Sequence, residues 1–126
     1  MPSEPLGILL ISGDHERAHY AFVVAAGAAA VGRAVVLFAT NEGCRALLDD
    51  WSQLHGAGRD AAVRARGVAG LGELREAVVQ LGVRMIACEA GLRMVGLDGA
   101  ALVAGTEIAG VTTFLEAVKG GQIVSL

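Results

Sequence analysis

Two cysteines carry most of the chemistry available to this sequence of 126 residues. Cys88 ends the strand-like segment 83–88 (VRMIAC) and is followed by Glu89, a pattern typical of a strand that leads into a helix. The first turn of a helix presents free amide hydrogens and a positive dipole, which stabilise a thiolate. We therefore expect Cys88 to be a nucleophilic or sulfur-carrying thiol. The alternative is a buried cysteine that only fills the core.

Cys44 occupies a similar position, since it follows Gly43 near the predicted start of another helix. It is the weaker functional candidate. Two cysteines this far apart form no metal-binding motif, and a cytoplasmic setting disfavours a structural disulfide. A redox pair with Cys88 would require the second and third strands to be neighbours.

The segment 15–19 (HERAH) matches the zinc motif H-E-x-x-H, in which two histidines lie one helical turn apart. That motif belongs inside a helix and needs a third ligand. Here we predict that it straddles a loop and the first turn of a helix, with His15 as a loop or cap residue and only the distant His55 remaining. We therefore expect no metal site, and adventitious metal binding by His15 and His19 is the alternative.

Motifs for nucleotide or hydrolase chemistry are incomplete. The glycines of 67–72 (GVAGLG) are in the wrong order for a dinucleotide fingerprint, and 105–110 has P-loop spacing but is followed by Val111 instead of lysine. Neither Ser12 nor Ser52 lies in a G-x-S-x-G setting. The sequence therefore predicts no cofactor.

Composition predicts one folded domain covering 1–126, because apolar residues make up 54% and charged residues 18%. A net charge of -3 argues against nucleic acid as a partner. The start of the chain has Glu4 where a signal peptide needs basic residues, so we expect a cytoplasmic protein. The apolar stretch 20–40 contains Arg33, and a helix, a turn and a strand explain it better than a membrane span.

Hydrophobic patterning places alternating strands and helices along the chain. The expected strands cover 6–12, 34–39, 83–88, 106–109 and 122–126. The expected helices cover 16–31, 42–54, 71–81 and 89–95, with a last helical stripe formed by Val111, Phe114, Leu115 and Val118. The glycine-rich segment 55–70 is predicted to be a loop. This alternation predicts an α/β fold with a parallel sheet and helices on both faces.

Ligands of such sheets bind at the carboxyl ends of the strands. The segments expected there are 13–16, 40–44, 88–91 and 109–112. We therefore expect His15, Thr40 and Asn41 to shape a pocket near Cys88, with Cys44 close by.

Three segments, 82–88 (GVRMIAC), 94–97 (MVGL) and 105–116 (GTEIAGVTTFLE), resemble the DsrE/DsrF-like family of small sulfur-relay proteins. The first half is similar too, with a strand ending in Ser-Gly and a second ending in Phe-Ala-Thr, whereas 55–70 has no clear counterpart. The resemblance implies a three-layer α/β/α sandwich with a mainly parallel five-stranded sheet. It also implies oligomers, often trimers or hexamers, and a persulfide carried on Cys88.

These expectations combine into a hypothesis of sulfur relay. The Cys88 thiolate would take sulfur from a donor protein and pass it to an acceptor thiol, with the amides of Glu89 and Ala90 stabilising the anionic sulfur. The expected partners are sulfur-donor and sulfur-acceptor proteins and further copies of the chain, without nucleic acid or membrane. The alternatives are an oligomeric binding or scaffold subunit, suggested by the alanine-rich 16–31, and a thiol redox protein that uses both cysteines.

Overall fold

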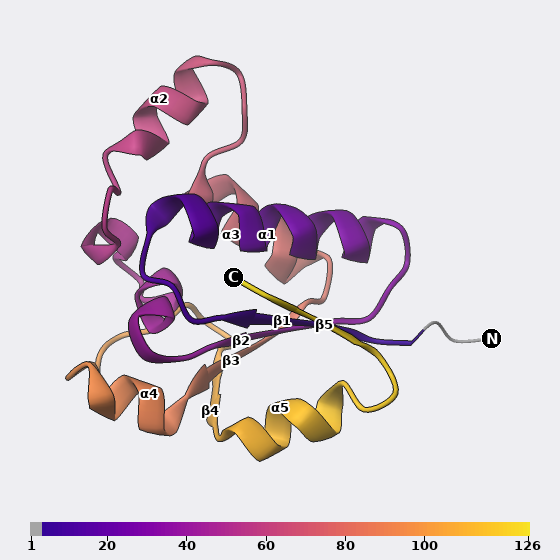
Figure 1. Cartoon of the computed structure of the whole chain (residues 1–126). Helices are drawn as coiled ribbons and strands as arrows, with labels where there is room; N and C mark the ends of the chain where they lie inside the picture. The colour runs from indigo at the N-terminus through magenta and orange to yellow at the C-terminus, as the bar shows by residue number, and fades with distance from the viewer. Residues whose placement is uncertain (1–3) are drawn as a thin grey trace.

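The computed structural model describes residues 4–126, in which five strands form one sheet in the order β4-β3-β2-β1-β5 (Figure 1). The strands are β1 (Leu6–Leu10), β2 (Val35–Ala39), β3 (Arg84–Cys88), β4 (Glu107–Ala109) and β5 (Gln122–Ser125). All four neighbouring pairs are parallel. The predicted parallel sheet is therefore confirmed, and each strand lies within two residues of its expected bounds.

Helices cover both faces of this sheet. They are α1 (His15–Ala30), α2 (Arg59–Ala65), α3 (Leu71–Gln80), α4 (Glu89–Met94) and α5 (Val111–Ala117). Figure 1 shows α1 and α3 on one side of the sheet and α4 and α5 on the other. The three-layer α/β/α sandwich is thus confirmed.

The core consists of two clusters, one on each side of the sheet. The larger cluster joins the sheet to α1 and α3 and includes Ile8, Leu37 and Phe22, all fully buried. The smaller cluster lies toward α5, where the rings of Phe38 and Phe114 stack with centroids 4.9 Å apart. Strands covered on both faces need apolar residues at every position, which explains the continuous runs in β1 and β2.

The predicted helix over 42–54 is wrong, because two short 3-10 helices, η1 (Asn41–Leu47) and η2 (Trp51–Gln53), occupy this region. Tertiary contacts take the backbone groups that an α-helix would use. Leu48 forms an antiparallel bridge with Leu102, and the amide of Asp49 donates to the carbonyl of Ala101. The Arg75 guanidinium also donates to the carbonyls of Ala46, Leu48 and Asp49.

The prediction of a continuous loop over 55–70 is also wrong, since α2 lies within it. The residue of α2 that is buried is a polar one, Asp60, so the helix has no apolar stripe to reveal it. Asp60 Oδ1 accepts hydrogen bonds from the Leu71 amide and from His15 Nε2, each at 2.8 Å. In Figure 1, α2 projects away from the sheet. This buried carboxylate ties the projection to α1 and α3, and the exposed pairs Arg59–Glu16 and Arg64–Glu73 join the same helices.

The apolar stretch 20–40 divides as predicted into a helix, a turn and a strand. Helix α1 ends at Ala30, Gly32 adopts a φ of 90°, and β2 begins at Val35. No helix within residues 4–126 is long and apolar enough to cross a bilayer.

Candidate functional site

Cys88 is the last residue of β3 and the N-cap of α4. Its extended backbone, with φ −68° and ψ 122°, turns the chain from strand to helix. The Sγ atom accepts a hydrogen bond from the amide of Gly91 at 3.3 Å. The prediction named Glu89 and Ala90 as donors, but these two residues form the exposed start of α4 and the recorded donor is Gly91. The sulfur is thus held by an amide hydrogen at the first turn of a helix.

Cys88 is a buried residue of the core. Cys88 is 7% exposed and belongs to the smaller core cluster, together with Phe38 and Phe114. Its strand partner in β4 is Ala109, which is half-buried. The thiol therefore lies in a mainly apolar environment, with little of the residue open to solvent.

Thr40 and Asn41 lie beside the Cys88 turn, because β2 and β3 are neighbours and Ala39 pairs with Ala87. The Thr40 hydroxyl donates to Asn41 Oδ1 at 3.3 Å. A Cβ atom placed on Gly91 would lie 2.6 Å from Thr40 Oγ1 and would also collide with the Asn41 backbone nitrogen. The structure therefore brings both predicted residues against the start of α4.

Cys44 is fully buried and belongs to the larger core cluster, on the α1 side of the sheet. Its thiol donates to the carbonyl of Ala39 at 3.5 Å. Burial raises the pKa of Cys44 to about 11, and the nearby charge of Cys88 acts in the same direction. A thiol with this pKa is protonated at neutral pH, so Cys44 is a poor nucleophile.

His15 is the first residue of α1 rather than a loop or cap residue, and it is 1% exposed. Its Nε2 pairs with Asp60, its ring stacks on His19 with centroids 5.7 Å apart, and its Nδ1 has no hydrogen-bond partner among residues 4–126. No hydrogen bond or ring contact among residues 4–126 joins it to Cys88. Through its pairing with Asp60, His15 links α1 to α2. The sequence predicts a place in the pocket for His15, and not this contact.

The H-E-x-x-H segment shows no metal-binding geometry. His19 Nε2 is bonded to the carbonyl of Ala69 at 2.8 Å, and His15 Nε2 is bonded to Asp60. Within the part of the chain that the structure describes, no group of three or more His, Cys, Asp or Glu side chains could hold a metal ion.

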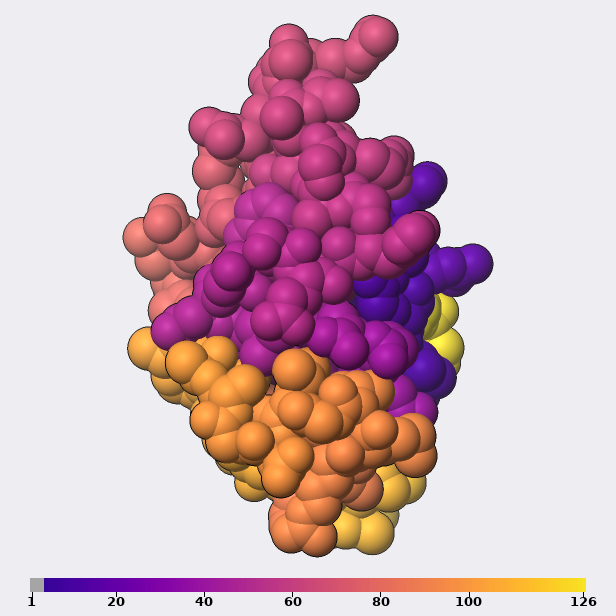
Figure 2. All heavy atoms as spheres, turned by 90° about the vertical axis from the view of Figure 1, so that its left-hand side faces the viewer, coloured from indigo at the N-terminus to yellow at the C-terminus, as the bar shows by residue number. Residues whose placement is uncertain are grey.

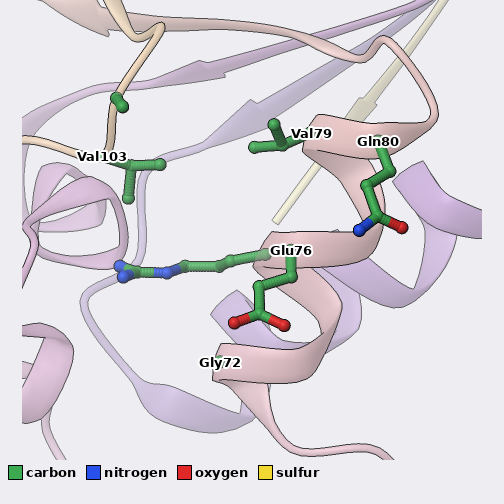
Figure 3. Close-up of a pocket in the computed structure, with 7 residues that line it drawn as sticks. Gly72, Glu76, Val79, Gln80 and Val103 are labelled. Atoms are coloured by element: carbon green, nitrogen blue, oxygen red, sulfur yellow. The ribbon is translucent and has the colours of Figure 1, made fainter.

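Several clefts of the described residues lie outside the Cys88 turn, and two of them are close to the predicted elements discussed above. One, of about 340 Å³, lies between α3 and the segment 103–104, and Figure 3 shows Val79 of α3 pointing toward Val103 across it, with Glu76 and Gln80 on the same helix. The other, of about 360 Å³, lies at the carboxyl edge and is lined by Gly13, Asp14, Glu42, Arg45, Gln53 and His55. Cys88 lines neither cleft.

Sequence reasoning missed Gly91 and Asp60. Gly91 follows Cys88 by three residues, which is the spacing at which an amide bonds to an N-cap side chain, and this spacing could have drawn attention to it. Asp60 gave no signal, because only the folded chain brings it to His15.

Figure 2 shows the face where the segments around 40–55 and 88–105 lie against each other, with α2 above them.

The chain is thus a three-layer α/β protein. Its Cys88 caps a helix at the carboxyl ends of the parallel strands. The model of the DsrE/DsrF/DrsH-like family matches residues 50–124, more than half of the chain, and the chain belongs to that family.

Two known proteins are similar over nearly the whole chain. The "Sulfur carrier protein DsrE2" of Allochromatium vinosum is 26% identical, over 92% of this chain and 93% of that protein. The crystal structure of the ychN protein from E. coli superimposes with a TM-score of 0.75 at 12% identity, over 98% of this chain and all of that one. This second likeness shows the fold alone.

Proposed function

We propose that the chain is a sulfur-relay protein that carries sulfur as a persulfide on Cys88. The observation that carries the proposal is the position of Cys88 Sγ, 3.3 Å from the Gly91 amide at the start of α4. Membership of the DsrE/DsrF/DrsH-like family and the similarity to a protein named as a sulfur carrier support it.

Loading is a sulfur transfer without net oxidation. The Cys88 thiolate attacks the outer sulfur of a donor persulfide, R–S–SH, and the new S–S bond forms as the donor's S–S bond breaks. The donor leaves as the thiolate R–S⁻ and takes up the proton that the Cys88 thiol lost. The product is Cys88–S–SH, and the Gly91 amide faces its inner sulfur.

Unloading repeats the step in the opposite direction. An acceptor thiolate attacks the outer sulfur of Cys88–S–SH, and Cys88 leaves as a thiolate that its helix start stabilises. The partners of this scheme are a protein with a persulfide and a protein with a thiol. We also propose a homo-oligomer, a trimer or hexamer, in which these partners meet the carboxyl edge of the sheet.

Cys44 serves as the internal control for this chemistry. Cys88 ends β3 and Cys44 lies in η1, which follows the neighbouring strand β2, but Cys44 is fully buried and its pKa is raised to about 11. The proposal therefore assigns the transferred sulfur to Cys88 alone, and it leaves no role for a redox pair.

Incubation with a small persulfide donor, followed by intact-mass measurement, tests the proposal. We expect wild-type protein and Cys44→Ser to gain one sulfur, and Cys88→Ser to gain none. An equal gain on Cys88→Ser contradicts the assignment. No gain on folded wild-type protein favours the alternative, a binding or scaffold subunit in which Cys88 only fills the smaller core cluster.

A further inference from the structure

We infer that Gly91 is a positioning residue for Cys88: its lack of a side chain lets α4 lie against the turn after β2, which fixes the amide that faces the sulfur. The inference rests on the proposed function and adds to it the residue on which the thiol geometry depends.

A hydrogen bond joins the Gly91 amide to the Cys88 sulfur. The Gly91 amide is the recorded donor to Cys88 Sγ, at 3.3 Å, and Gly91 is buried. A donor held in place before the thiolate forms needs no rearrangement when charge appears on the sulfur. Any displacement of this amide therefore acts on the thiolate more strongly than on the neutral thiol.

The backbone of α4 at Gly91 lies very close to the backbone of the turn after β2. A Cβ atom on Gly91 would lie 2.6 Å from Thr40 Oγ1 and 3.1 Å from Thr40 Cα, and it would collide with the backbone nitrogen of Asn41. Rotation of the Thr40 side chain relieves only one of these contacts, because the other two involve backbone. Only glycine permits this spacing between α4 and the turn.

The turn after β2, which faces Gly91, is held rigidly. Asn41 has a φ of 52°, in the left-handed region, where the chain leaves β2. Its neighbour Gly43 donates to the carbonyls of Ile11 and Thr40, at 2.9 and 3.0 Å. A side chain at position 91 would therefore displace α4 rather than this turn, and the amide would leave the sulfur.

The rest of the chain offers a matched control. Gly58 is also at the start of a helix, with a φ of −62°, and an added Cβ atom would have no neighbour within 4 Å. Gly58→Ala and Gly91→Ala introduce the same methyl group at a helix start, but only the second meets backbone.

The experiment measures the rate of Cys88 alkylation by iodoacetamide as a function of pH, by mass spectrometry of the tryptic peptide 85–93. We expect Gly91→Ala to react about tenfold more slowly at pH 7 and to reach half-maximal rate about one pH unit higher, while Gly58→Ala follows wild type. Thermal unfolding verifies that each variant is folded. A folded Gly91→Ala with the wild-type pH profile overturns the inference.

A second measurement needs no variant at position 91, and so it decides the matter if Gly91→Ala does not fold. In the NMR spectrum of wild-type protein, the Gly91 amide should shift with the same pH midpoint as the alkylation rate, and the shift should vanish in Cys88→Ser. A Gly91 amide that does not follow the thiol overturns the inference. Failure of the proposed function is a separate result, since wild-type protein would then gain no sulfur from a persulfide donor whatever the alkylation profile shows.

Discussion

At the scale of single residues, the two thiols differ both in position and in surroundings, since Cys88 ends β3 whereas Cys44 lies in η1, beyond the end of β2. Cys88 keeps 7% of its surface exposed and accepts a hydrogen bond from an amide, whereas Cys44 is fully buried and donates to a carbonyl. The acceptor role suits a thiolate and the donor role suits a neutral thiol. From the sequence we expect Cys44 to be the weaker functional candidate, and the fold adds the different surroundings of the two thiols.

Cys44 should make the stability of the protein depend on alkaline pH. Its pKa is about 11 in the folded chain against an ordinary value of 9.0, so folding favours the protonated thiol. The stabilisation is complete below pH 9 and is lost as the pH rises toward 11, by about 2 kcal/mol. Urea unfolding of wild-type protein and Cys44→Ala between pH 8 and 11 measures this. A wild-type curve that runs parallel to the variant over this range contradicts the prediction.

At the scale of elements, hydrophobic pattern located the strands and the helices that bury an apolar face. It failed where polar contacts hold the chain. Helix α2 is held by Asp60, and the region 42–54 by backbone pairing with the segment 101–103 and by Arg75. These contacts join residues far apart in sequence, so no local periodicity reveals them. The same reason hid Gly91, whose contact with the turn after β2 exists only in the folded chain.

Asp60 should contribute far more to stability than an exposed carboxylate with an equally close partner. Burial favours its neutral form, but hydrogen bonds from the Leu71 amide and the His15 ring hold the pKa of Asp60 below its ordinary value. We expect Asp60→Ala to reduce the free energy of unfolding by about 3 kcal/mol, because it leaves these donors buried without an acceptor. Chemical denaturation at pH 7 measures the loss.

Glu107 provides the comparison for this prediction. It pairs with Arg84 at 2.6 and 2.8 Å, yet both side chains are more than 40% exposed. Glu107→Ala should therefore cost less than about 1 kcal/mol. If Asp60→Ala and Glu107→Ala lose the same free energy of unfolding, burial does not explain the contribution of the Asp60 pair to stability.

At the scale of the whole molecule, the alternation of elements was enough to predict the parallel sheet and the layers on both faces. The rule for carboxyl ends led to the expectation that Thr40 and Asn41 lie near the Cys88 turn, and in the structure both lie against the start of α4. It also placed His15 at this edge, but the rule could not foresee that α2 would cover this residue. Strand order was not available from sequence either, and it is the adjacency of β2 and β3 that puts Thr40 beside Cys88.

The proposed homo-oligomer gives a prediction at this scale. Ile108 of β4 and Val111 and Leu115 of α5 are each about half exposed, although large apolar side chains are usually buried. We expect light scattering to give a mass that is a multiple of 12.8 kDa, and Leu115→Glu to lower it while the fold is retained. A clean monomer of wild-type protein contradicts this expectation without affecting the assignment of Cys88.

The most direct test of the central claim is the location of the transferred sulfur. Trypsin separates the two thiols, since Cys88 falls in the peptide 85–93 and Cys44 in the peptide 34–45. After exposure to a persulfide donor and capping of the product, we expect one additional sulfur on the peptide 85–93 and none on 34–45. Sulfur found on 34–45, or on neither peptide of folded protein, would contradict it.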